Sequence, residues 1–253
     1  MFGIPIGRPW LVMQSHAAAA FDGGEVPFVG TLFIKLPGGS AKHAYRHVHA
    51  PRVRAPYRLY CSPPEHCRGI ATSRRAAGVG LTEVVPFNYD DVAQSLAIEL
   101  NVSVDTLHRA AQRSVAPQHC PSREIIVLWL AKLLIMKLTI AAHPERQRFA
   151  WVDAGFNVYR VRNMDPPPAP WTSFWPAPHS VAMARHPGAC HNELRNTNYS
   201  SCPVATYLYG DRLAWMRLLP LYFAHVRRLV LVESAKIFRA DAGPPPTGCA
   251  NRA

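Results

Sequence analysis

The chain has 253 residues, of which 49% are hydrophobic and 17% are charged. A chain of this length and composition can bury a substantial core, which excludes disorder throughout. The 28 Lys and Arg residues outnumber the 16 Asp and Glu residues and give a formal charge of +12. This charge is nearly all arginine, which suits bidentate phosphate contacts, and it favours polyanionic partners or phosphate-bearing ligands without choosing between them.

The six cysteines are spread along the chain without a C-x-x-C pair, which excludes a disulfide scaffold and a zinc ribbon evident from spacing. An even number of cysteines still permits disulfides. Residues 1–14 lack a basic flank followed by a continuous apolar stretch, so the sequence predicts no cleaved signal peptide. We expect a cytoplasmic protein or one that associates peripherally with a membrane.

The first half of the chain predicts strands and one helix in an order typical of a layered fold. Apolar runs predict strands at residues 10–14, 28–36, 57–61 and 82–87, and a helix at 65–77 begins after two prolines that suit its first turn. The last three elements form one β-α-β unit, which favours a parallel sheet.

Helices are predicted next at residues 90–100 and 104–115, followed by a single long apolar helix at 124–142. Its apolar residues contribute roughly −3 to −6 kcal/mol to membrane insertion, whereas Lys132 and Lys137 oppose it by roughly +5 to +7 kcal/mol. The free energy of membrane insertion is therefore near zero at best, and a buried core helix is favoured. The two lysines lie about 140° apart around the helix, so one of them is expected to face a site or a partner.

The remaining elements complete the α/β pattern. A buried strand at 148–155 ends in an acid and a glycine, residues 164–201 are expected to form a long ordered loop or lid, and a further strand follows at 203–209. A helix at 212–238 is expected to kink or break at Pro220. We predict one domain over residues 1–240 and a disordered tail over 241–253.

The apolar helix with Lys132 and the strand Phe149-Ala-Trp-Val-Asp-Ala-Gly155 carry a resemblance to a known family. Together they resemble the HtrL/YibB family of bacterial proteins, whose signature is a lysine-bearing apolar helix followed by a strand of the form Phe-x-Trp-Ile-Asp-Ala-Gly. The resemblance follows the order of elements over about residues 57–240, but it is close at only some ten residues. It implies a GT-A-like nucleotide-diphospho-sugar transferase fold, with a mainly parallel sheet flanked by helices.

The resemblance also implies an activity, which is transfer of a sugar from a nucleoside-diphosphate donor to a glycan or lipid-linked acceptor. Asp153 is then the contact to a Mn²⁺ or Mg²⁺ ion or to the donor ribose, because a hard cation with oxygen ligands neutralises a leaving diphosphate. Trp151 and Gly155 shape the wall of the donor site, and Lys132 offsets phosphate charge. The usual Asp-x-Asp motif is incomplete, since Asp153 is its sole acid.

Three further residues are candidates on weaker local grounds. Arg74 or Arg75 on the helix at 65–77 could contact the diphosphate, although a solvated helix face is the favoured explanation of both residues. Asp211 could be the catalytic group on the acceptor side, although an acid before a helix is first of all an N-cap.

Other classes of function stay open. Arg52, Arg54 and Arg58 alternate with Tyr57 and Tyr60, a pattern that fits a nucleic-acid or anionic-surface binder. A zinc site and a non-catalytic glycosyltransferase-like domain are two further alternatives. The residues that would form the zinc site are His179, His186, Cys190 and His191.

Overall fold

The computed structural model describes residues 26–36, 55–78, 81–113, 122–153, 178–192 and 197–235, so the strand expected at 10–14 and the tail lie outside the described residues. These residues form α/β architecture. The elements in chain order are β1 (Phe28–Ile34), β2 (Tyr57–Ser62), α2 (Pro64–Ala76), β3 (Thr82–Pro86), α3 (Tyr89–Leu100), α4 (Val104–Arg113), α5 (Arg123–Leu130), α6 (Lys132–Ala142), β4 (Arg148–Val152), β5 (Val181–Asn192), β6 (Thr197–Asp211) and α7 (Arg212–Ala235).

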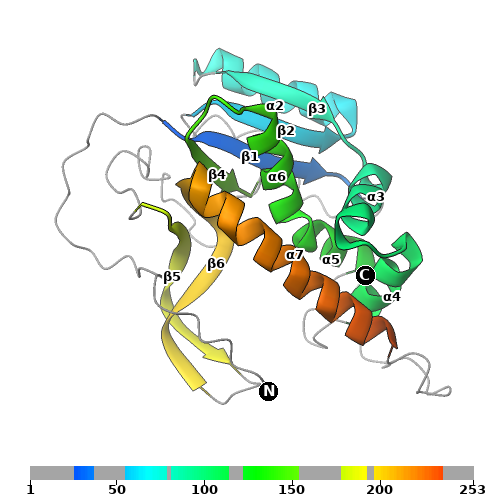
Figure 1. Cartoon of the computed structure of the whole chain (residues 1–253). Helices are drawn as coiled ribbons and strands as arrows, with labels where there is room; N and C mark the ends of the chain where they lie inside the picture. The colour runs from blue at the N-terminus through cyan, green and yellow to red at the C-terminus, as the bar shows by residue number, and fades with distance from the viewer. Residues whose placement is uncertain are drawn as a thin grey trace.

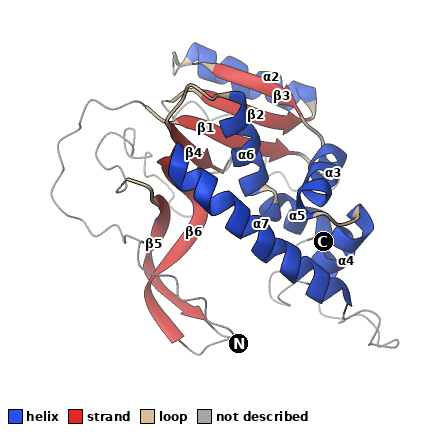
Figure 2. Ribbon diagram, in the orientation of Figure 1, coloured by secondary structure: helices blue, strands red, loops and turns tan. Residues whose placement is uncertain are grey.

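The described strands form one mixed sheet in the order β3-β2-β1-β4-β6-β5. Strands β1 to β4 run parallel to one another, and β6 runs antiparallel to both β4 and β5. Helices α6 and α7 lie in front of the sheet and α2 lies behind it (Figure 1, Figure 2). The expected α/β class is therefore confirmed, with an antiparallel pair added to the parallel strands.

Each face of the sheet has its own hydrophobic core, because side chains alternate along every strand. Phe28 and Trp151 join the core under α3 to α7, and Val29 and Val152, their neighbours in sequence, join the core under α2. All seven residues of β1 are buried or nearly so. A strand that is apolar on both faces is typical of the centre of a parallel sheet.

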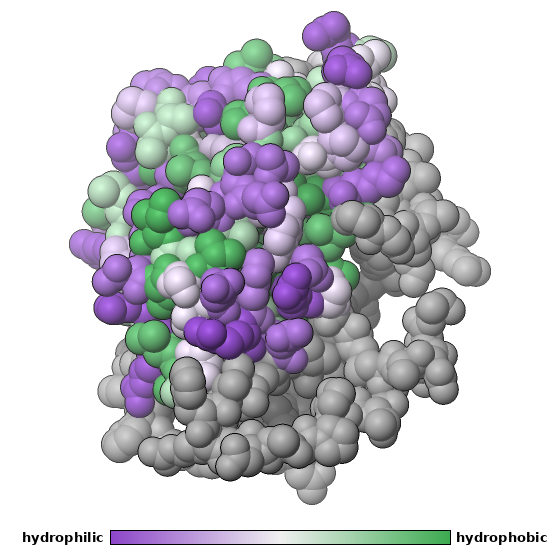
Figure 3. Space-filling model, turned by 90° about the vertical axis from the view of Figure 1, so that its right-hand side faces the viewer, coloured by the Kyte–Doolittle hydropathy of each residue, from purple (hydrophilic) through white to green (hydrophobic). Residues whose placement is uncertain are grey.

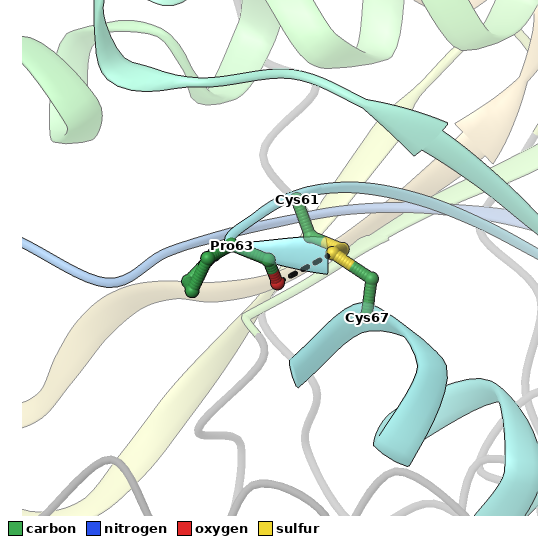
Figure 4. The surroundings of a disulfide bond; sticks show 3 residues. All are labelled: Cys61, Pro63 and Cys67. Carbon is green, nitrogen blue, oxygen red and sulfur yellow. Dashed lines mark hydrogen bonds between the residues drawn. A yellow bond between two sulfur atoms is a disulfide. The ribbon is translucent and has the colours of Figure 1, made fainter. Parts of the chain in front are cut away.

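Helix α2 begins as the sequence predicts and is joined to the preceding strand by a disulfide. Pro64 occupies its first turn, where a missing backbone N–H costs nothing. Cys61 at the end of β2 is bonded to Cys67 in α2, and the sulfur of Cys67 lies 3.2 Å from the carbonyl oxygen of Pro63 (Figure 4). The disulfide therefore ties the carboxyl end of β2 to the helix that follows it.

The single helix expected at 124–142 is wrong, because the structure divides this segment into α5 and α6 at Ala131. Arg123–Ala142 is the one stretch of the described chain long and apolar enough to cross a membrane, judged by length and composition alone. Half of its most apolar window is buried inside the fold. This burial agrees with the core helix that the energy comparison favours.

The two lysines of α6 face different partners, as their spacing predicts. Lys137 pairs with Glu99 of α3 at 2.5 Å, on the exposed side of the helix. Lys132 points the other way, toward the end of β4. Gly30 allows α6 to lie this close to β1, because a Cβ atom there would come within 2.7 Å of the Thr139 hydroxyl.

The last third of the chain differs from the expected loop, and the break expected as one alternative at Pro220 is absent. The segment 164–201, expected as a loop, contains β5 and the start of β6, which pair in an antiparallel hairpin. Helix α7 runs without a break through Pro220. Pro220 has no backbone N–H, so it cannot donate a hydrogen bond to the Met216 carbonyl oxygen one turn earlier. Both residues lie on the exposed side of α7, where water can solvate that oxygen.

Candidate functional site

A lysine, an aspartate and a tryptophan meet where β4 ends. The Lys132 ammonium lies 2.9 Å and 3.1 Å from the two carboxylate oxygens of Asp153. The indole N–H of Trp151 donates a hydrogen bond of 2.8 Å to the same carboxylate. The Lys132 and Asp153 side chains keep 17% and 26% of their surfaces exposed, so a ligand in solution can reach them.

Neighbouring elements hold these three side chains in place. Trp151 is buried in the core, and its ring lies 5.9 Å from the Lys132 ammonium. The buried hydroxyl of Thr31 in β1 donates to the carbonyl oxygen of Val152 and so fixes the last residue of β4. The Tyr222 hydroxyl of α7 donates to the carbonyl at the end of α5, two residues before Lys132.

The site lies at a special position in the sheet. The chain builds β2 and β3 on one side of β1 and then places β4 on the other side, so the strand order reverses between β1 and β4. In open α/β sheets, ligands bind outside the carboxyl ends of the strands at such a reversal. Asp153 follows the carboxyl end of β4 directly.

Figure 3 looks at the side of the molecule on which β1, β2 and β3 end in Figure 1. Its described surface mixes hydrophobic and hydrophilic residues.

Arg74 and Arg75 lie far from this site. They belong to the last turn of α2, which ends at the opposite, amino edge of the sheet. Arg74 is fully buried and donates to the carbonyl oxygen of Ala55 at 2.6 Å and to the hydroxyl of Thr82 at 2.8 Å. The structure therefore gives Arg74 an anchoring role and does not bring either arginine to Asp153.

Asp211 also lies at the amino edge. It pairs with Arg148, the first residue of β4, whereas Asp153 follows the last one. Five positions along a strand correspond to about 16 Å. One carboxylate oxygen of Asp211 accepts a 2.7 Å hydrogen bond from the backbone N–H of Ala214, and the other accepts from that of His179. The N-cap alternative accounts for these contacts, and Asp211 does not meet Asp153.

Most of the remaining candidate side chains lie outside the described residues, and two that are described are buried. Gly155, Arg52 and Arg54 lie outside the described residues. The side chains of the proposed zinc group lie outside them too, except for that of His179. The aromatic members of the binder pattern, Tyr57 and Tyr60, are buried in the two cores, so they cannot stack on nucleic-acid bases.

The described side chains fit a resident divalent cation poorly. Mg²⁺ and Mn²⁺ prefer oxygen ligands, and the site offers one carboxylate whose oxygens already face an ammonium and an indole N–H. Among the described residues there is no group of three or more His, Cys, Asp and Glu side chains that could hold a metal ion.

A second polar cluster, which the sequence did not indicate, lies at the amino edge. The carboxylate of Glu83 in β3 accepts from the Arg58 guanidinium at 2.6 Å and lies 3.1 Å from Nε2 of His143. The Arg58 Nε–H also donates to the Tyr60 hydroxyl at 2.9 Å. These residues are distant in sequence and share no motif; the pairing of β2 with β3 joins Arg58 to Glu83, and the end of α6 brings His143 to them.

Comparison of the chain with protein-family models, with curated proteins and with solved structures finds no match. The site geometry and the residue resemblance are thus the grounds for a functional proposal.

Proposed function

We propose that the protein binds a nucleoside-diphosphate sugar at the carboxyl edge of its sheet and transfers the sugar to a hydroxyl-bearing acceptor. The observation that carries this proposal is the partly exposed Lys132–Asp153 pair at the reversal between β1 and β4. Polar ligands bind at this place in open α/β sheets. The lysine supplies the positive charge that a diphosphate requires.

A GT-A-like arrangement of the sheet is part of the proposal. Its first four strands lie in the order 3-2-1-4 that doubly wound nucleotide-binding sheets also use. The antiparallel strands β6 and β5 extend the sheet beyond β4, at the end opposite the β-α-β unit. This support concerns the architecture and is separate from the residue resemblance around Asp153.

Each of the three site residues has a role in the proposal. The Lys132 ammonium brings a positive charge to the diphosphate from its place beside Asp153. Asp153 accepts a hydrogen bond from a hydroxyl of the donor ribose. The indole N–H of Trp151 donates to the same carboxylate and fixes its position. The low exposure of Lys132 makes its charge more effective than it would be in open water.

The reaction itself exchanges one bond for another. An acceptor hydroxyl oxygen forms a bond to the anomeric carbon of the sugar, and the bond from that carbon to the diphosphate oxygen breaks. The nucleoside diphosphate leaves with the bonding electrons, and the acceptor proton passes to water or to a base. Lys132 stabilises the charge that develops on the diphosphate, which is the step at which fixed positive charge is most effective.

The proposal is tested by thermal unfolding with UDP, GDP or CMP, each with and without Mn²⁺. A nucleotide at about 100 times its Kd adds about 2.7 kcal/mol to the free energy of unfolding. We expect one nucleotide to stabilise the native chain, and Lys132→Met and Asp153→Asn to lose that effect. Lys137→Met is the matched control, because it removes a lysine from the same helix that pairs with Glu99 instead.

The outcomes separate the alternatives. Stabilisation that requires Mn²⁺ would show that a metal ion takes part in nucleotide binding beside Asp153. It would contradict the part of the proposal in which Lys132 alone supplies the positive charge. Stabilisation by a nucleotide without release of nucleoside diphosphate from any sugar nucleotide would identify a non-catalytic domain, which the single acid at residue 153 favours. An equal response of all three variants, or none from the native chain, contradicts the donor site.

A further inference from the structure

Helix α7 exposes an unusual number of large hydrophobic side chains. Its inner side is buried in the core through residues such as Trp215 and Phe223. Its outer side is apolar as well. Six of the eleven large hydrophobic residues that are exposed in the described chain belong to this helix, namely Leu213, Met216, Leu221, Leu229, Leu231 and Val232.

The same outer side carries positive charge. Arg217, Arg227 and Arg228 are exposed, whereas Glu233, the one acid of the helix, is half-buried. At about 100° per residue, Leu213 and Leu231 lie on one line along the helix, and the three arginines lie within about 60° of it. The three arginines and the apolar residues within about 80° of that line thus share one surface, which we call the outer face of α7; these apolar residues are Leu213, Met216, Leu221 and Leu231.

We propose that the outer face of α7 binds an anionic lipid surface. Helices that lie in a membrane interface insert aliphatic side chains between the lipids while their arginines bind the phosphates, with the aliphatic part of each arginine alongside the acyl chains. The charge of the face is complementary to that of an anionic membrane, and the chain's net charge of +12 adds a general attraction.

The composition of the face favours lipid over the other polyanions. Single-stranded nucleic acids are bound through aromatic side chains on which the bases stack. The exposed large hydrophobic residues of α7 are all aliphatic or methionine. The helix lies across the front of the molecule, outside the sheet (Figure 1). A flat surface can therefore meet it without entering the Lys132–Asp153 site, and this inference is independent of the proposed transferase.

Flotation of the full chain with lipid vesicles tests the inference. The vesicles contain phosphatidylcholine alone or phosphatidylcholine with phosphatidylglycerol. We expect the native chain to bind only the vesicles that contain phosphatidylglycerol. In the double variant Arg217→Gln/Arg228→Gln, the affinity for these vesicles should fall about fivefold for each arginine removed. Leu221→Ser should weaken binding about tenfold, since a leucine at 70% exposure loses its insertion.

Matched controls lie on other helices. Ile98→Ser removes an aliphatic side chain from α3 that is 69% exposed, and Arg68→Gln removes an exposed arginine from α2. Both controls should bind vesicles like the native chain. No flotation with either vesicle overturns the inference, as does an equal loss in variants and controls. Binding of an oligonucleotide, without flotation, that is lost in the α7 variants would assign the face to nucleic acid instead.

Discussion

The two edges of the sheet use charged residues in different ways. At the amino edge, the buried guanidinium of Arg74 is bonded to Ala55 and Thr82, and its carbon lies 4.2 Å from the centre of the Tyr57 ring. At the carboxyl edge, Lys132 and Asp153 pair with one another and stay partly exposed. Both edges also carry a partly exposed ion pair, Arg58–Glu83 at the amino edge and Lys132–Asp153 at the carboxyl edge, but only the second lies at the carboxyl ends of the strands where the strand order reverses.

This difference shows why a charged residue on an α/β fold is not by itself a ligand contact. Burial lowers the pKa of Arg74, although the nearby Tyr57 acts in the opposite direction. A guanidinium in this position bonds to the protein's own backbone, because an unpaired buried donor is costly. We therefore expect substitutions at the amino edge to change stability and substitutions at the carboxyl edge to change ligand binding.

The largest effect on stability is expected for Arg74→Ala. The change removes a fully buried side chain and leaves the Ala55 carbonyl without its donor, at a cost of about 3–4 kcal/mol in the free energy of unfolding. Urea denaturation measures this cost. Arg75→Ala, at the exposed neighbouring position, should cost less than about 0.5 kcal/mol. Similar losses in the two variants would show that Arg74 does not anchor the amino edge.

A smaller loss of about 2 kcal/mol is expected for Gly30→Ala, because overpacking forces α6 away from β1. The new Cβ atom would meet the Thr139 hydroxyl at 2.7 Å and the Met136 sulfur at 3.0 Å. Since α6 reaches both edges, this variant should also weaken nucleotide stabilisation at Lys132. Adding Thr139→Ala should recover part of the stability. A double variant that is simply additive would contradict the close contact.

The alkaline limit of stability should depend on Tyr222, which holds α5 beside the carboxyl edge. Burial raises the pKa of Tyr222 from its usual value near 10 to about 12. Between these values the unfolded chain loses the proton and the folded chain keeps it, so stability falls by about 2 kcal/mol as pH rises from 10 to 12. Tyr222→Phe should flatten this decline. Unfolding curves measured across that pH range check the difference, and identical slopes would exclude the contribution.

The smallest effect on stability is expected at the carboxyl edge itself. Lys132→Met should change the free energy of unfolding by less than about 1 kcal/mol, because partly exposed ion pairs contribute little. The same variant should lose the stabilisation by nucleotide. Denaturation and nucleotide titration of one protein sample give both values. A large loss of stability with intact nucleotide binding would reverse the assignment of the two edges.

The sequence predicts the elements of the fold better than it predicts their assembly. Apolar periodicity correctly indicates β1 to β4 and α2 to α4, and the separation of Lys132 from Lys137 around the helix agrees with their pairing to different partners. Periodicity cannot show where a crossover helix ends relative to a strand, so it left Arg74 and Asp211 as candidates for the same site as Asp153. Strand direction and register, which depend on contacts distant in sequence, place them at the other edge.

The turn at Ala131 limits the length of the helix on each side of it. At about 1.5 Å per residue, α5 and α6 are about 12 Å and 17 Å long, and each is too short for a hydrocarbon layer about 30 Å thick. The same residues as one continuous helix would be long enough to cross it. In the fold, α5 and α6 instead pack as two short helices whose junction is held by the contacts of Lys132 with Asp153 and of Tyr222 with Leu130.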